Sequence, residues 1–375
     1  MRTLSICKTA LFGMLALSAT VAFAEDGCGK PCRGNWVASW GTAQQLAVQA
    51  RAIPARETPP PKVEAQTVRM VARSTIAGKA IRLALSNSFG YAPVRIDAVQ
   101  IARAAAGAAI TAGSNRTLTF GGRQDVTLVP GAQIYSDPIA FDVPAQADLA
   151  VSLYLAKDSG PTTAHPMGMR TAWLAPGNQV AAQKLEGATE FRSYVWLAGI
   201  DVLAADKAAT IVAFGDSITD GFATTNDADA AWPAFLARRL AAQGNLLLEA
   251  INDISFNAFR GIPASEKLSA QDIIAGYRLL IGRAHLHGLT IIGCTLTAFE
   301  GVPTFTADGE KMRQEVNRWI RDSDEFDAVI DFDVATRDPA APTKLRPAFD
   351  SGDHIHPNDA GNKAMAEAID LKLFH

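Results

Sequence analysis

A serine and a histidine–aspartate pair are the residues of this chain best suited to covalent chemistry. Ser217 lies in the heptapeptide GDSITDG at 215–221, and Asp353 and His356 lie more than a hundred residues later in the pentapeptide DHIHP at 353–357. A serine hydroxyl is a weak nucleophile until a base removes its proton, and an imidazole oriented by a carboxylate can serve as that base. A spacing of three residues lets one helical turn or tight bend bring Asp353 and His356 to the same side. These residues therefore predict a nucleophilic hydrolase.

The residues around Ser217 predict how it is positioned. Residues 210–214 form an apolar, partly β-branched run that is typical of a strand buried on both faces, and the glycine after it allows a sharp turn. Ser217 then lies at the carboxyl end of the strand, where open α/β sheets place their ligands. Residues 229–243 carry apolar side chains at helical spacing and predict a helix. The chain from residue 210 to 243 is therefore expected to form a strand, a turn and a helix.

Three blocks of sequence resemble those of the GDSL, or SGNH, hydrolases. They are FGDSITDG at 214–221, AIND at 250–253 and DHIHPNDAG at 353–361. The resemblance implies Ser217 as the nucleophile, His356 as the base and Asp353 as the residue that orients it. It implies two donors to the oxyanion, the backbone N–H of Ser217 and the side chain of Asn252. It also implies a flavodoxin-like α/β domain with a parallel sheet, and no cofactor.

One block of that family has no counterpart here. The family's second block supplies a glycine N–H to the oxyanion hole from a loop after the second strand. Only residues 241–247 separate the predicted helix from the strand that leads into Asn252, which is too few for that strand and loop. Because the family's second strand lies at a sheet edge, we expect a smaller sheet with a newly exposed edge. Losing one such donor costs ~3 to 4 kcal/mol in a well-studied protease, so we also expect weakened activity.

The remainder of the C-terminal half alternates between strands and helices. Periodicity predicts helices at 270–287, 309–321 and 358–373 and strands at 289–296 and 328–332. Asp331 and Asp333 lie near the end of a predicted strand and could line the cleft. Turn and helix-capping roles are the favoured interpretation. We assign residues 206–375 to the hydrolase domain, with 204–209 as the junction.

Residues 35–205 have a different pattern. Short alternating runs at 36–40, 81–86, 94–101 and 149–155, separated by turn residues, predict an antiparallel β-sandwich or jelly roll. The segments WGTA at 40–43 and LSNSFG at 85–90 resemble the N-terminal region of a bacterial GDSL subgroup similar to xylan-associated arylesterases. Exposed aromatic residues there would suit carbohydrate, but core or interdomain packing is the favoured interpretation of the tryptophans, which are Trp36, Trp40, Trp173 and Trp196.

Several other functions fit the same residues less well. His354 and His356 with Asp350 or Asp353 suggest a metal site, but no third ligand cluster is evident in the sequence. The Gly-Asp-Ser loop lacks the lysine of a phosphate-binding loop. Asn252 has the alternative role of capping the next turn, and the heptapeptide alone is also compatible with an ordinary turn.

Composition and the N-terminus bear on location and partners. A formal net charge of −3 without a basic run gives no support for nucleic-acid binding. Residues 1–24 read as a secretory signal, with an apolar core too short for a membrane span, so we expect an exported, periplasmic or extracellular protein. Export favours a Cys28–Cys32 disulfide, and Cys294 lies in a predicted buried strand.

Together these observations predict an exported serine esterase. Its substrates would be small acyl esters, such as acetyl groups on plant polysaccharide, and neither cofactor nor metal is implied. The alternative is a catalytically impaired protein whose sandwich binds glycan while its hydrolase half serves as a scaffold. A family resemblance indicates reaction type far better than substrate.

Overall fold

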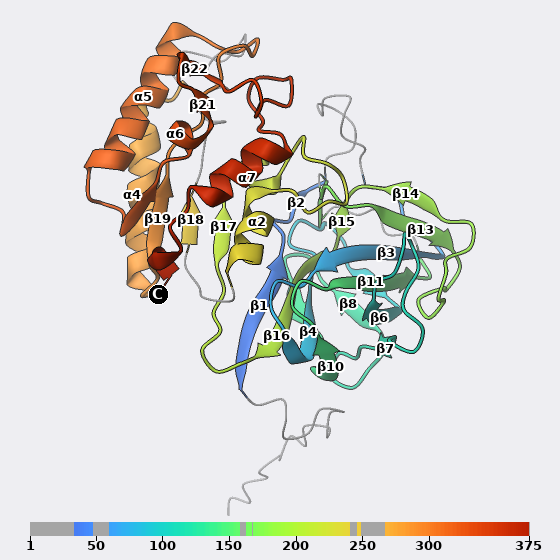
Figure 1. Cartoon of the computed structure of the whole chain (residues 1–375). Helices are drawn as coiled ribbons and strands as arrows, with labels where there is room; N and C mark the ends of the chain where they lie inside the picture. Colours follow the sequence, from blue (N-terminus) through green and yellow to red (C-terminus); the bar gives the residue numbers. More distant parts are fainter. Residues whose placement is uncertain are drawn as a thin grey trace, which may run out of the picture.

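The computed structural model describes residues 34–47, 60–157, 163–166, 168–240, 246–248 and 267–374, the strand at 246–248 through its backbone alone. Three predictions lie outside the described residues: the oxyanion donor Asn252, the Cys28–Cys32 disulfide and the signal segment 1–24. The described residues form two hydrophobic clusters, one in each half of the chain. Figure 1 shows the strand-rich half beside the helix-bearing half.

The N-terminal half consists of antiparallel sheets. One contains strands in the order β1-β16-β4-β10, with β9 also paired to β4, and another runs β14-β13-β3-β11-β6-β7. Smaller sheets join β15-β12-β2 and β5-β8. The strands are β1 Asn35–Gly41, β2 Gln45–Leu46, β3 Gln66–Arg73, β4 Gly78–Ser86, β5 Val94–Ile96, β6 Ala98–Arg103, β7 Arg116–Thr117, β8 Val126–Leu128, β9 Gln133–Tyr135, β10 Ile139–Val143, β11 Asp148–Leu155, β12 Thr163–His165, β13 Ala172–Pro176, β14 Thr189–Phe191, β15 Tyr194–Val195 and β16 Leu197–Ala204.

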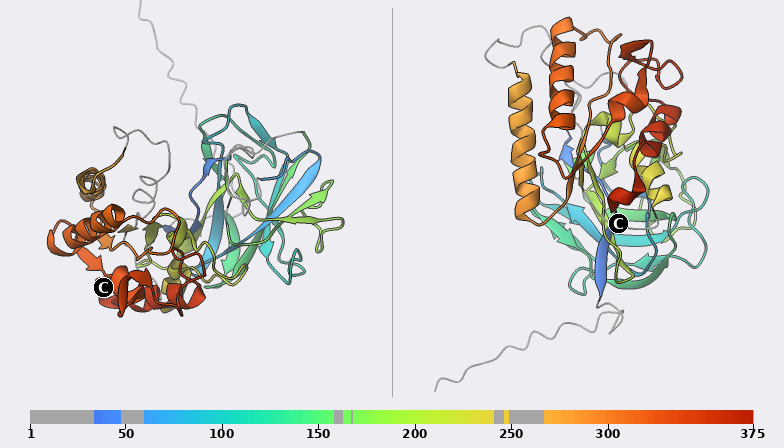
Figure 2. Two further views of the ribbon diagram at one scale, coloured as in Figure 1. Left: turned by 90° about the horizontal axis from the view of Figure 1, so that it is seen from above. Right: turned by 60° about the vertical axis from the view of Figure 1, so that its left-hand side comes forward.

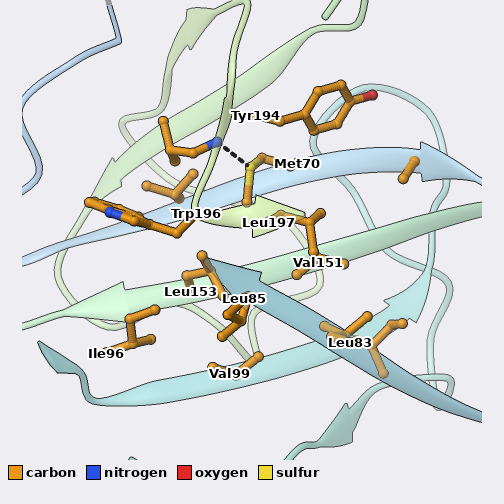
Figure 3. Packing of buried hydrophobic residues seen from close by; sticks show 14 of the residues in the cluster. Met70, Leu83, Leu85, Ile96, Val99, Val151, Leu153, Tyr194, Trp196 and Leu197 are labelled. Atoms are coloured by element: carbon orange, nitrogen blue, oxygen red, sulfur yellow. Dashed lines mark hydrogen bonds between the residues drawn. The ribbon is translucent and has the colours of Figure 1, made fainter. Parts of the chain in front are cut away.

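The core of this half lies between the facing sheets. Alternate residues of β4 point into it, because successive side chains of a strand lie on opposite faces. Figure 3 shows Trp196 and Met70 within this core, where the backbone N–H of Val195 donates to the sulfur of Met70 at 3.3 Å. Each large apolar side chain removed from water contributes roughly 1.5–3 kcal/mol to folding. The prediction that Trp173 and Trp196 serve in packing is confirmed, because both side chains are buried. A β-rich N-terminal half is also confirmed, whereas the jelly-roll topology and the boundary at 205/206 stay predictions.

The C-terminal half alternates strands and helices as the sequence predicts. Its elements are β17 Val212–Phe214, α1 Ser217–Asp220, α2 Trp232–Arg239, β18 Leu246–Leu248, α4 Ala270–Leu286, β19 Ile291–Cys294, α5 Ala307–Asp322, β20 Ala328–Ile330, α6 Phe332–Thr336, β21 Arg337–Asp338, β22 Ala341–Leu345, α7 Asp359–Glu367 and the 3-10 helix Leu371–Phe374. A capping box between Ser269 and Asp272 fixes the start of α4. The predicted helix at 358–373 is instead two pieces, and the predicted strand at 328–332 ends at Ile330, where Asp331 caps α6.

A sheet of parallel pairs organises this half. The order is β17-β18-β19-β20, with every neighbouring pair parallel. Helices α4 and α5 lie on one side of the sheet, and α2 and α7 on the other (Figure 2). Cys294 is buried within β19, as predicted. The flavodoxin-like assignment of the whole domain stays a prediction.

Strand β17 ends the sheet among the described residues. It pairs with β18 on one side, and Val212 and Phe214 expose 51% and 53% of their surfaces, so the prediction of a strand buried on both faces is wrong. The sequence predicts that the strand of the second block is missing from an edge of the sheet, and β17 lies at such an edge. Helix α2 lies between β17 and β18 in the sequence, and these two strands are parallel neighbours in the sheet.

Candidate active site

A one-turn helix presents Ser217. The chain leaves β17 at Phe214, and Asp216 caps α1 by accepting from the N–H of Ile218 at 3.0 Å. Gly221 ends the turn with a φ of 85°, in the left-handed region that favours glycine. A Cβ there would lie 2.5 Å from the Cβ of Ala231, so space also requires glycine. Ser217 thus occupies the first helical position, where backbone N–H groups have no partner within the helix.

The structure brings Ser217, His356 and Asp353 together. The Oγ of Ser217 lies 2.9 Å from Nε2 of His356, and Nδ1 of His356 lies 2.8 Å from Oδ2 of Asp353. Because the carboxylate can only accept, Nδ1 carries a proton in this pair and Nε2 of a neutral ring is left to accept from the serine hydroxyl. The side chains of His356 and Asp353 expose 16% and 24% of their surfaces. The geometry is the one that a nucleophile, a base and an orienting acid require.

The segment around Asp353 is shaped to hold the imidazole. Oδ1 of Asp353 accepts from the backbone N–H groups of Ile355 and His356, at 3.2 and 3.0 Å. Asn358 caps α7 and also donates to the carbonyl of Asp350 at 3.1 Å, which ties the segment to the helix. The ring of Phe222 lies against His356 with centroids 4.5 Å apart. The imidazole is therefore fixed in both position and orientation.

Hydrogen bonds set the charge of Asp353. Partial burial alone would raise the pKa of this carboxyl group, because a less polar environment disfavours its ionised form. The imidazole of His356 and the two backbone amides act in the opposite direction and hold the pKa well below its ordinary value. Asp353 is consequently ionised whenever the protein is near neutral pH.

The other residues considered for chemistry lie apart from this arrangement. His354 is exposed and pairs with Asp350 at 2.6 Å instead of joining Ser217. Within the described part of the chain, no three or more His, Cys, Asp or Glu residues are grouped so as to hold a metal ion. In the same part, no helix has both the length and the apolar character needed to cross a membrane.

Asp333 is a structural residue. It is fully buried and accepts from Arg313 at 2.7 Å, Arg321 at 2.8 Å and Arg337 at 2.9 Å. Asp331 caps α6 and accepts from Arg321 at 2.8 Å. The prediction of a cap is confirmed for Asp331, whereas Asp333 serves a buried ion-pair network that the sequence pattern did not indicate.

The sequence predictions missed a contact between the β-rich N-terminal half and the one-turn helix α1 that carries Ser217. His165 of β12 places Nε2 at 2.8 and 2.9 Å from the carboxylate oxygens of Asp220, the last residue of α1. Its Nδ1 lies 2.8 Å from the carbonyl oxygen of Ala43. The side chain of His165 is only 9% exposed. No local motif surrounds His165, so the fold alone reveals this contact.

Comparison with known proteins supports the family resemblance over part of the chain. Residues 250–369, about a third of the chain, match the family described as GDSL-like lipase/acylhydrolase. The matched part contains Asp353 and His356 and begins after Ser217. A search among curated proteins gives no match.

Solved structures similar to this chain include proteins described as GDSL lipases and an acetylxylan esterase. A GDSL-like lipase from Bacteroides thetaiotaomicron is 14% identical, with 42% of this chain and 84% of that chain covered and a TM-score of 0.32. An acetylxylan esterase from Geobacillus stearothermophilus is 18% identical, with 42% and 91% covered and a TM-score of 0.32. A member of the lipolytic G-D-S-L family from Veillonella parvula is 16% identical, with 42% and 94% covered and a TM-score of 0.27. The resemblance predicted from the sequence motifs is confirmed, because residues 250–369 of this chain match the family described as GDSL-like lipase/acylhydrolase.

Proposed function

We propose that the protein is an exported serine esterase that hydrolyses small acyl esters. The observation that carries the proposal is the continuous line of contacts from Ser217 Oγ to His356 to Asp353. The match of residues 250–369 to an acylhydrolase family supports an ester or related acyl substrate. The apolar segment at residues 1–24, preceded by basic residues, is the basis for proposing export to the periplasm or the medium.

The contacts support a two-step reaction. Ser217 Oγ attacks the ester carbonyl while its proton passes to Nε2 of His356, and Asp353 stabilises the resulting imidazolium. The tetrahedral intermediate collapses, and the leaving alcohol takes the proton from Nε2. Water then attacks the acyl-serine with His356 again as base, which releases the acid and restores Ser217. Each step conserves protons, because the proton that His356 accepts from the attacking hydroxyl or water is returned to the leaving group.

The oxyanion site is the weak part of the proposed mechanism. The backbone N–H of Ser217 and the side chain of Asn252 are the proposed donors, and the strand and loop that carry the family's glycine donor do not fit within residues 241–247. Removal of a single such donor lowers kcat by roughly 10² to 10³ in a protease. We therefore expect turnover that depends on serine but is slow for an esterase.

Hydrolysis of p-nitrophenyl acetate tests the proposal. The protein lacking residues 1–24 is compared with its Ser217→Ala variant, and circular dichroism confirms that both are folded. We expect turnover above the buffer rate that Ser217→Ala abolishes. Equal background rates from two folded proteins would contradict the esterase function.

A pocket on the sandwich favours a second candidate function, glycan binding. It has a volume of about 380 Å³ on the outer face of the sheet that contains β1, β16 and β4. Small residues form its floor, since Gly41, Gly199 and Ala84 are neighbours across three strands. Trp40, Phe89 and Tyr135 are its aromatic lining residues. The amides, hydroxyls and the carboxylate of Asp201 in the lining suit a hydroxylated ligand.

Binding of xylotriose to the Ser217→Ala protein tests this second function without interference from turnover. Tyr135→Ala removes an aromatic wall, and Tyr91→Ala is the matched control because Tyr91 is 79% exposed outside the pocket. Calorimetric binding that Tyr135→Ala weakens and Tyr91→Ala leaves unchanged would support it. No binding at millimolar sugar would exclude this sugar as a ligand.

A further inference from the structure

The sandwich holds the turn that follows the nucleophile through neighbouring residues of one segment. His165 contacts Asp220, and Met169, Arg170 and Thr171 contact the loop that follows α1. The loop residue engaged by these three is Asp227, whose backbone N–H donates to Met169 and whose carbonyl accepts from Arg170 at 3.0 Å. Its carboxylate accepts from the backbone N–H and the hydroxyl of Thr171, at 2.7 and 2.6 Å.

The held loop has a backbone that needs external support. Ala223, Asp227 and Asp229 all have φ between 48° and 67°, in the left-handed region that residues other than glycine rarely adopt. Such conformations persist where the surrounding contacts over-determine them. Asp229 is held by Arg73 at 3.0 Å and Arg170 at 3.2 Å, both from the sandwich. The shape of the loop therefore depends on residues of the other half of the protein.

The nucleophile turn itself has little intrinsic stability. Helix α1 has four residues, and isolated helices of this length do not form in water. Its N-terminal end is capped by Asp216, and its C-terminal end carries Asp220, whose carboxylate faces His165. Ser217 is three residues before Asp220, so a displacement of that carboxylate moves the turn that carries the nucleophile.

The partners of His165 define the charge state that the contact requires. Both ring nitrogens face oxygen atoms that only accept, a backbone carbonyl on Nδ1 and a carboxylate on Nε2. Only the imidazolium has an N–H on both nitrogens. The contact with Asp220 is thus a charge-assisted hydrogen bond in a largely buried position, which is stronger than a neutral one.

We propose that His165 is a positioning residue for the esterase reaction: through Asp220, the sandwich fixes the turn that carries Ser217. In the described part of the chain, the ring of His165 is hydrogen-bonded to Ala43 and Asp220 and to neither Ser217 nor His356, so it acts through α1. The sandwich is then part of the architecture of the active site and not an independent appended module. This inference rests on the proposed function for its kinetic consequence, while its structural consequence is measurable without turnover.

The test compares His165→Gln and Asp220→Asn with His285→Gln. His285 is the matched control because it also pairs with an aspartate, Asp327, at 3.1 Å, yet lies 46% exposed on α4 away from the nucleophile. We expect both test variants to lower kcat for p-nitrophenyl acetate by roughly ten- to a hundredfold, the scale of a small misplacement of reacting groups. KM should change far less, and His285→Gln should match the wild type.

The double variant separates positioning through Asp220 from a general loss of stability. If His165 acts through Asp220, then His165→Gln combined with Asp220→Asn should lose about as much kcat as either change alone, because neighbouring residues of one interaction are not additive. Multiplied losses, or an unchanged kcat in both single variants, would overturn the inference.

Hydrogen exchange provides the readout that does not need activity. In His165→Gln, amides of residues 217–227 should exchange faster, while amides of β3 and β11 keep the protection of the wild type. This result would support the positioning role even if Ser217-dependent turnover were absent, so failure of the proposed function is distinguishable. Unchanged exchange in 217–227, or equally faster exchange across the whole sandwich, would overturn it.

Discussion

Two histidine–aspartate pairs flank the same one-turn helix, and they differ in what the second ring nitrogen faces. In His356–Asp353 the far nitrogen faces the hydroxyl of Ser217, a group that can donate. In His165–Asp220 the far nitrogen faces the carbonyl of Ala43, a group that only accepts. The first pair is suited to exchange a proton, and the second is suited to keep one.

This difference shows that a histidine–aspartate pair does not identify a catalytic base by itself. Both pairs have carboxylate contacts of 2.8 Å, and the side chain of each histidine is largely buried. The third partner decides the role, because a base needs a nitrogen free to accept. The histidine–aspartate distance alone therefore does not distinguish His165 from His356.

Asp353→Asn should cause the largest loss of kcat among the variants of the two pairs. An asparagine cannot hold the Nδ1–H tautomer of His356 in the same way, and the corresponding change in a serine protease lowers kcat by ~10⁴ with its geometry intact. We expect a loss of similar scale here, measured with p-nitrophenyl acetate. Asp220→Asn should fall far short of it. Equal losses in the two variants would contradict the different roles assigned to the pairs.

Gly221→Ala should disturb both pairs at once. Gly221 lies between Asp220, which contacts His165, and Phe222, whose ring contacts His356. A left-handed alanine costs ~1–2 kcal/mol, and the close approach to Ala231 adds roughly 1–3 kcal/mol of overpacking. Urea denaturation measures the resulting fall in the free energy of unfolding.

Gly107→Ala is the matched control for Gly221. Gly107 also has a left-handed φ, of 59°, but a Cβ there would meet no atom within 4 Å. This variant should therefore show only the conformational cost of ~1–2 kcal/mol. Losses of the same size in the two variants would mean that the contact with Ala231 adjusts without cost.

The sequence predicts the His356 pair because its determinants are local. Asp353 and His356 are three residues apart, and Ser217 follows an apolar strand directly, so short-range patterns suffice. Helix α4 is predicted almost to its ends for the same reason, since its cap and periodicity lie within the segment. The prediction for residues 94–101 is less successful, because the run divides into β5 and β6 at Asp97.

The sequence does not predict the His165 pair because its determinants are distant. Ala43, His165 and Asp220 come from three separate parts of the chain, and only the fold brings them together. The left-handed conformations of Asp227 and Asp229 are equally invisible, as aspartate occurs in many other conformations. Residues in short motifs can therefore be identified from the sequence, whereas the support from the β-rich N-terminal half is seen only in the structure.

The smallest predicted effect is a pH dependence of the free energy of unfolding that comes from the His165–Asp220 pair. Burial alone would lower the pKa of His165, but the hydrogen bond and charge of Asp220, with the bond to Ala43, raise it above 6.5. A group whose pKa rises on folding stabilises the protein fully below the pKa of the unfolded chain, here about 6.5, and this contribution is lost as pH rises through the folded pKa.

Urea denaturation of the wild type and His165→Gln across this range checks the sign. The difference between their free energies of unfolding should be largest below pH 6.5 and shrink as pH rises through the raised pKa of His165. Asp353 behaves oppositely, because its lowered pKa makes its contribution present at neutral pH and lost only in strong acid. A difference that grows between pH 6.5 and 9 would mean that His165 is neutral in the folded protein, and the distinction between the two pairs would then fail.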